Sequence, residues 1–166
     1  MLVMIVSVFA IGFVLGLSRT GADAAAEVPL AALVGLQAFR LPLELVMHSA
    51  ATLGIMPVEL SYSGYNFDIV TGLGAALLFA AMRAGWRVPR SVIWAWNVWG
   101  FWCLAVIAVI AVTSSPMVRL FGEDPRHVNT WVLFFPHVWL PVVLVTVALA
   151  GHITVTRALR RGSGPV

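Results

Sequence analysis

The sequence predicts an all-α polytopic membrane helix bundle with about five transmembrane helices. Of its 166 residues, 61% are hydrophobic and only 10% are charged, and the mean hydropathy is +0.97. A soluble domain carries about 25% charged residues, so this chain has too few charges to cover a water-facing surface. Five apolar segments also approach the length of a span, about 20 residues.

The first apolar segment, 1–18, is at the short limit for a span. It is apolar from its first residue and lacks the basic start of a signal peptide, although Ala22-Asp23-Ala24 resembles a cleavage site. We therefore expect a retained first span, followed by a polar break from Arg19 to Asp23.

Four longer apolar segments follow, and polar or turn-forming stretches separate them. They are 29–56, 67–84, 91–113 and 131–156. No internal repeat or composition change marks a second domain. We expect a single transmembrane domain over 1–159 and a short cytoplasmic tail over 160–166.

The arginines predict the orientation of these spans. With the N-terminus outside, seven of the ten arginines lie on the cytoplasmic side: Arg19, Arg83, Arg87, Arg90, Arg157, Arg160 and Arg161. The outer side has Arg119 and Arg126 beside Glu123 and Asp124. This bias follows the positive-inside rule and predicts a membrane protein with its N-terminus outside and a cytoplasmic C-terminus. If 29–56 did not span, the bias would be lost.

Segment 29–56 carries a polar stripe on one helix face, formed by Gln37, Arg40, Glu44 and His48. Charged side chains at mid-membrane are expensive, so this stripe is a candidate functional site. Arg40 and Glu44 are spaced i, i+4 and can form an ion pair on their own helix. The planar fork of arginine suits such a pair at low dielectric. Pro42 lies between them and frees the carbonyl of Ala38.

The third span begins with two polar residues. Asn66 is a good helix N-cap, and Asp68 in the first turn suits the positive end of the helix. A capping role is the simpler interpretation. Because this end faces outward, Asp68 could also line an outer vestibule beside His48.

The fifth segment carries His137 between Pro136 and Pro141. Two prolines should kink this span, and Pro141 should free the carbonyl of His137 itself. His137 and His48 lie at similar predicted depths, as two histidine ligands of one haem would. Haem proteins of this type usually offer more matched histidines, and we expect no cofactor.

His152 lies near the cytoplasmic end of the same segment. It could cap the last carbonyls, lie at the interface as a satisfied histidine, or meet Asn97 of the fourth span. By depth, His152 and Asn97 are inner and Arg40 and Glu44 central. The outer candidates are His48, His137 and Asp68. Such an order could relay protons, provided that the helices are neighbours.

Other chemistry has no support in the sequence. Cys103 is alone, so neither an intrachain disulfide nor a cysteine metal site is expected. Phosphate-binding, dinucleotide, nucleophile-elbow and zinc-protease motifs do not occur. No sequence motif therefore supports an enzymatic activity, and no metal is expected. The absence of a long basic patch argues against a nucleic-acid partner.

Several segments resemble a family of small bacterial integral membrane proteins of unassigned function. They are Phe39-Arg40-Leu41-Pro42-Leu43-Glu44-Leu45-Val46, Asn66-Phe67-Asp68-Ile69, Trp96-Asn97, Ser115-Pro116, and Phe135-Pro136 through Trp139-Leu140-Pro141 to His152. The resemblance covers roughly 35–160 and implies a multi-span inner-membrane protein. It marks Arg40, Glu44, Asn66, Asp68, Asn97 and His152 as pattern positions, whereas His48 and His137 are less typical. The family often has another span upstream.

Two functions remain open at this point. The first is transport or ion and proton handling through the Arg40–Glu44 site. The second is a structural or accessory membrane subunit whose ion pair only fixes helix packing, with the bilayer and other membrane proteins as partners. A cavity beside the two side chains would favour the first, and sealed packing the second.

Overall fold

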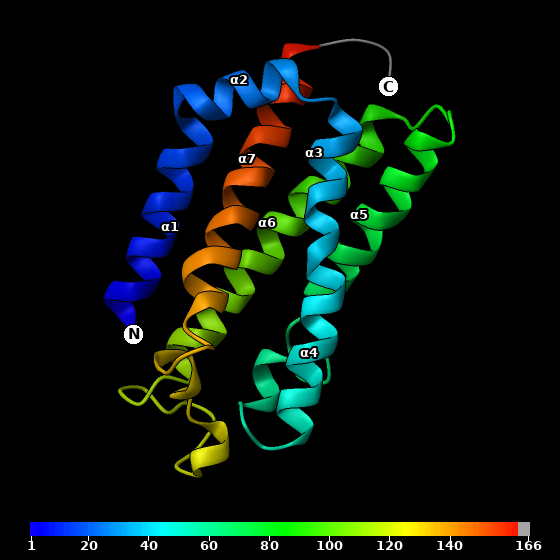
Figure 1. Ribbon diagram of the computed structural model, residues 1–166. Helices are drawn as coiled ribbons and strands as arrows, with labels where there is room; N and C mark the ends of the chain where they lie inside the picture. The colour runs from blue at the N-terminus through cyan, green and yellow to red at the C-terminus, as the bar shows by residue number, and fades with distance from the viewer. Residues whose placement is uncertain (163–166) are drawn as a thin grey trace.

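In the computed structural model, which describes residues 1–162, long helices run up and down beside one another (Figure 1). All regular structure in this part of the chain is helical, which confirms the all-α prediction. The α-helices are α1 (Leu2–Leu17), α2 (Arg19–Glu27), α3 (Leu30–Leu36), α4 (Arg40–Thr52), α5 (Asp68–Arg83), α6 (Arg90–Thr113) and α7 (Thr146–Arg161).

Within residues 1–162, three helices are long and apolar enough to cross a membrane: Leu30–Thr52, Arg90–Thr113 and Leu140–Arg161. The bent pair α1 and α2 would make a fourth. Helix α5 matches the predicted segment 67–84 but has only 16 residues, about 24 Å at 1.5 Å per residue. It is therefore shorter than a straight span requires.

The polar break predicted after the first segment is itself a helix. Ser18 has an extended backbone that ends α1, and its hydroxyl accepts a hydrogen bond from the Gly21 N–H at 3.2 Å, which caps α2. Helix α2 bends away from α1 by 55° and crosses the end of the bundle (Figure 1).

The second segment is a helix with one irregular turn. A 3₁₀ turn at Gln37–Phe39 joins α3 to α4, and Pro42 follows in the first turn of α4. Proline has no N–H to bond the carbonyl four residues earlier, and this accounts for the irregular turn at this point. Beside it, Gly72 of α5 lies so close to the backbone of Leu41 that a Cβ atom would overlap it.

The last span begins later and ends later than predicted. Residues 131–139 contain a short 3₁₀ turn at Trp131–Leu133 and no long helix. The helix starts at Leu140 with a π-helical turn, Leu140–Val145, and continues as α7 to Arg161. Pro141 lies in its first turn, where proline is tolerated. Of the predicted tail, Arg160 and Arg161 therefore belong to α7, and 163–166 lie outside the described residues.

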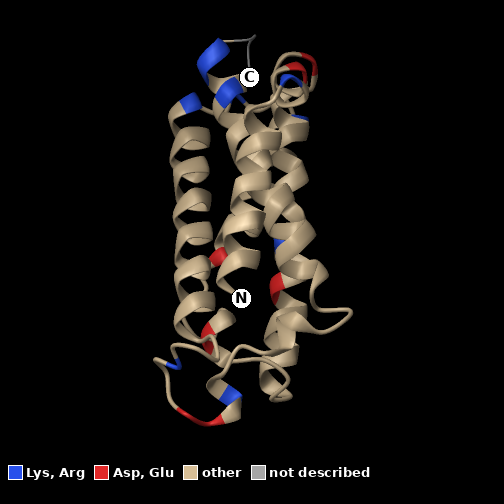
Figure 2. Ribbon diagram, turned by 90° about the vertical axis from the view of Figure 1, so that its left-hand side faces the viewer, with Lys and Arg blue, Asp and Glu red and all other residues tan. Residues whose placement is uncertain are grey.

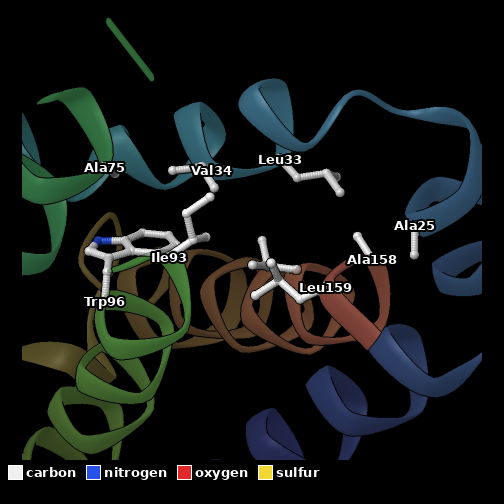
Figure 3. Close-up of a cluster of buried hydrophobic side chains, with 9 residues drawn as sticks. Ala25, Leu33, Val34, Ala75, Ile93, Trp96, Ala158 and Leu159 are labelled. Carbon is white, nitrogen blue, oxygen red and sulfur yellow. The ribbon is translucent and has the colours of Figure 1, made fainter. Parts of the chain in front are cut away.

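Helix α7 is central and packs against α1, α2, α3 and α6. A first apolar core lies near the end that carries α2, with Val34 of α3 and Ile93 of α6 among its fully buried members (Figure 3). Gly12 and Gly16 let α1 approach α7 closely, because Cβ atoms there would lie 2.9 Å from Leu149 Cδ2 and 2.7 Å from Ile153 Cβ. Small residues four apart are a frequent basis of close helix packing in membranes.

The two ends of the bundle differ in charge, and its sides are apolar. The end with α2 and the last turn of α7 carries much of the blue ribbon in Figure 2. The helix order places the seven arginines predicted to be cytoplasmic at this end. On the sides, large apolar residues such as Val3, Leu77, Trp102 and Val109 are exposed. An exposed apolar surface of this kind is typical of contact with lipid.

Candidate functional site

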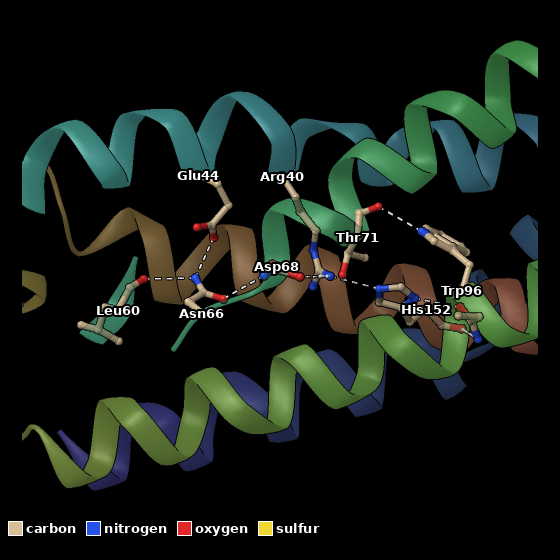
Figure 4. A network of polar contacts seen from close by, with 9 residues as sticks. Arg40, Glu44, Leu60, Asn66, Asp68, Thr71, Trp96 and His152 are labelled. Carbon is tan, nitrogen blue, oxygen red and sulfur yellow. Dashed lines mark hydrogen bonds and ion pairs between the residues drawn. The ribbon is translucent and has the colours of Figure 1, made fainter. Parts of the chain in front are cut away.

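Arg40 is the centre of a buried polar network formed by four helices (Figure 4). Its side chain is 1% exposed, and Nη1 lies 2.8 Å from Asp68 Oδ1 of α5 and 3.2 Å from His152 Nε2 of α7. The predicted ion pair with Glu44 is wrong: the carboxylate bound to Arg40 comes from another helix. A spacing of i, i+4 allows a pair on one helix, but Asp68 lies within reach because Gly72 brings α5 against α4.

The ring of His152 is held on both nitrogens. Because arginine can only donate, Nε2 accepts from Arg40. The proton is therefore on Nδ1, which lies 2.8 Å from Asn97 Oδ1 of α6. Asn97 Nδ2 in turn donates to Thr156 Oγ1 at 2.8 Å. The contact between His152 and Asn97 that the sequence allowed is present, and it fixes a neutral imidazole.

The same ring lies between aromatic side chains. The centroids of Trp96 and Phe101 are each 5.3 Å from its centroid. Gly100 faces it so closely that a Cβ atom would overlap Cε1 and Nε2. The aromatic rings and the glycine leave His152 little room to turn, so it presents Nε2 to Arg40.

Asn66 connects the second carboxylate to this network. Its Nδ2 donates to Glu44 Oε1 at 2.8 Å and to the Leu60 carbonyl at 3.1 Å. Its Oδ1 accepts from the Asp68 N–H at 3.1 Å, but Asn66 is not the predicted N-cap, because Phe67 occupies that position. Asn66 thus holds Glu44 and the start of α5 together.

A mostly apolar cavity of about 90 Å³ adjoins the network. Arg40, Glu44 and Asp68 line it at one place, and apolar side chains of α1, α4, α6 and the π-helical turn form most of the remaining wall. Within the described residues, Arg40 Nη2 and Glu44 Oε2 are buried without a hydrogen-bond partner. The site therefore combines nearly complete burial of its charges with an adjacent empty space.

Two of the predicted residues lie outside this network. His48 Nδ1 is 2.7 Å from Ser63 Oγ, and its ring stacks on Tyr62 at 4.3 Å. His48 therefore does not share a vestibule with Asp68, which belongs to the Arg40 pair.

His137 precedes the last helix, and its ring packs edge-on against Trp131 at 4.9 Å. Its carbonyl, predicted to be free opposite Pro141, accepts from the Leu140 N–H at 3.0 Å. His48 and His137 thus have separate surroundings. In the described part of the chain, no three His, Cys, Asp or Glu side chains form a metal-binding group.

Three further residues were missed by the sequence analysis. Asn129 and Trp131 line the cavity, and Gly100 makes room for His152. Asn129 lies in the loop that precedes the 3₁₀ turn at Trp131, and the hydropathy pattern does not predict the course of this part of the chain. Gln37, the first residue of the stripe, is fully buried, with its amide against Gly151 of α7.

Comparison with known families covers nearly the whole chain. Residues 1–160 match the profile of a domain of unknown function, DUF8737. The chain belongs to this family. The DUF8737 match includes every residue of the Arg40 network, so the site lies within the family's domain. No curated protein and no solved structure matches the chain.

Proposed function

We propose that this DUF8737 protein is a five-span protein of the bacterial inner membrane, with its N-terminus outside and its C-terminus in the cytoplasm. The support is the gathering of seven arginines at one end of the bundle, against Arg119 and Arg126 at the other. In this arrangement α1 and α2 form a bent first span, and α5 crosses where packing against α3, α4 and α6 covers it.

The proposed function is proton handling, with Glu44 as the residue that binds and releases the proton. The observation that carries it is a count of charges. The network contains one guanidinium, two carboxylates and a neutral imidazole, and the guanidinium is bound to Asp68. An ionised Glu44 would leave one excess negative charge in a low-dielectric site, which is costly.

A proton on Glu44 removes this excess charge without breaking the Arg40–Asp68 pair. Oε1 keeps its bond from Asn66, and the unpartnered Oε2 is free to carry the proton. Because Glu44 lines the cavity, Oε2 can exchange its proton with a group that enters there. The proposal is therefore a carboxyl group that alternates between neutral and charged forms beside a small cavity.

The test is proton flux in liposomes that contain the purified protein. A potassium diffusion potential drives protons inward, and an entrapped dye reports internal pH. We expect flux above that of empty liposomes, and its loss in Glu44→Gln, which keeps the Asn66 bond but cannot ionise. Glu123→Gln, in an exposed loop, is the control and should retain the flux. Equal flux in wild type and Glu44→Gln would contradict the proposal.

A structural role is the second candidate, and near-complete burial favours it. Arg40 and Glu44 are each 1% exposed, and the network joins α4, α5, α6 and α7. In that case Glu44→Gln would lower the yield or stability of the folded protein, and the wild type would show no flux above empty liposomes. The protein would then serve as an accessory subunit whose buried pair specifies helix contacts.

A further inference from the structure

The cavity beside Arg40 is small and mostly apolar, which suits part of a slender apolar chain. Its volume, about 90 Å³, is far below the roughly 300 Å³ at which pockets for drug-sized ligands begin. Its wall includes Val8 and Phe9 of α1, Leu104 and Ile107 of α6, and Leu144 of the π-helical turn. Such a wall suits hydrocarbon and leaves room for one chain.

Four buried polar atoms without partners belong to residues of this same wall. Among residues 1–162, they are two donors, Arg40 Nη2 and Trp131 Nε1, and two acceptors, Glu44 Oε2 and Asn129 Oδ1. Buried polar atoms are nearly always hydrogen-bonded, so several orphans around one cavity indicate an occupant that bonds them. A group that both donates and accepts meets this requirement.

Charge restricts the headgroup further. The wall has one guanidinium against the carboxylates of Glu44 and Asp68, and Asp68 already binds the guanidinium. A carboxylate or phosphate headgroup would add a negative charge where the one guanidinium is already neutralised by Asp68, and it would be disfavoured. A neutral hydroxyl group donates to Glu44 or Asn129 and accepts from Arg40 or Trp131 without that cost.

The cavity continues toward the side of the bundle that faces lipid. Ile5 of α1 and Ala108 of α6 line both the cavity and a shallow outer groove, whose other residues are Val109, Val112 and Thr113. The groove therefore follows the α1–α6 seam. The wall on the cavity side contains Met1, Met4 and Met47, whose flexible side chains adapt to an entering chain.

We propose that the cavity binds a neutral, hydroxyl-bearing amphiphile with a single apolar chain, which enters from the bilayer between α1 and α6. The hydroxyl donates to Glu44 or Asn129 and accepts from Arg40 or Trp131, and the chain lies along the apolar wall toward Ile5 and Ala108. This binding does not require that Glu44 move protons, so it stands apart from the proposed function.

Photo-labelling of the full-length protein in phosphatidylcholine nanodiscs tests the proposal. The probe is a long-chain primary alcohol with a diazirine near the end of its chain, and mass spectrometry locates the adducts. We expect adducts on peptides that contain Ile5 or Ala108, and competition by the unmodified alcohol but not by an alkane or fatty acid of equal length. Ala108→Phe should remove them, because it fills the seam, whereas Ala105→Phe on the exposed face of α6 should not.

Three results would overturn the proposal. The first is labelling spread evenly over lipid-facing peptides, such as those with Leu73 and Leu77 of α5. The second is equal labelling in Ala108→Phe and wild type, with both proteins monodisperse. The third is stronger competition by the fatty acid than by the alcohol. Proton flux is measured separately, so a failure of labelling leaves the role of Glu44 intact, and a failure of flux leaves the alcohol site intact.

Discussion

Gly100 of α6 lies directly against the ring of His152 on α7, where any side chain would overlap Cε1 and Nε2. The ring cannot move aside cheaply, because Nδ1 is held by Asn97 and Nε2 by Arg40. The missing side chain at position 100 therefore decides where the imidazole lies and how it meets the guanidinium.

Replacing Gly100 by alanine should destabilise the protein by about 1–3 kcal/mol, the usual cost of adding volume to a packed interior. The added methyl group pushes His152 away from Arg40 and weakens their hydrogen bond. Unfolding by sodium dodecyl sulfate in mixed micelles, followed by circular dichroism, measures the change. Ala105→Leu adds more volume on the exposed face of the same helix and should cost far less. Equal stabilities of the two variants would contradict this role of Gly100.

Removing Arg40 should be among the most damaging changes in the chain. Arg40→Met leaves Asp68 charged, buried and unpaired, and breaking a buried pair in this way costs about 3–5 kcal/mol. The double variant Arg40→Met, Asp68→Leu removes both charges and should recover much of that loss. The same unfolding assay measures both proteins. A double variant less stable than Arg40→Met alone would show that the damage does not arise from the unpaired carboxylate.

Much of the architecture follows from local sequence signals. The apolar segments 67–84 and 91–113 match α5 and α6 within one residue at each end, because turn-forming residues bound them. The stripe of segment 29–56 contains Arg40 and Glu44, and both are buried in the network. Six of the eight candidate residues lie in that network. Polar side chains are few in these apolar helices, and such side chains tend to pair with one another.

The partner of Arg40 could not be predicted in the same way. The sequence displays neighbours along one helix, so Glu44 was the visible candidate, whereas Asp68 comes close only after α5 folds against α4. Helix α2 was missed for a different reason. Its polar residues indicate a loop, but Ser18 caps a new helix there. His137 was misplaced because hydropathy extends the last span across residues 131–139, where Pro136 disfavours a long helix.

The loop at the end of the bundle with few arginines contains an exposed ion pair between Asp124 and Arg126. Hydrogen bonds from the side chain and backbone N–H of Arg126 lower the pKa of Asp124 to about 2. Arg126→Gln should raise this pKa toward the ordinary value of about 3.9, with the backbone bond retaining part of the shift. Since folding lowers the pKa, the pair's contribution to stability is complete above pH about 3.9 and is lost as pH falls toward 2.

Carbon-13 NMR of the labelled aspartate carboxyl measures this titration. Arg119→Gln is the matched control, because Arg119 binds Glu123 and leaves the bonds of Asp124 intact. An unchanged midpoint in Arg126→Gln, or an equal change in Arg119→Gln, would show that Arg126 does not set the pKa of Asp124.

Arg157 of α7 holds the bend between α1 and α2. Its Nη1 donates to the carbonyl of Gly16 at 2.7 Å and to that of Ser18 at 2.9 Å. Carbonyls at the end of a helix lack partners within it, and a hydrogen bond to a charged donor contributes about 1.5–3 kcal/mol. Arg157→Ala should therefore lower the free energy of local opening at the bend by about this amount. The amides of 19–27 would then exchange with deuterium faster, while those of α6 stay unchanged.

Arg160→Ala removes an exposed arginine one turn away and should leave exchange in α2 as it is in the wild type. If both variants exchange alike, the bend is held by α2 packing on α7 and not by Arg157.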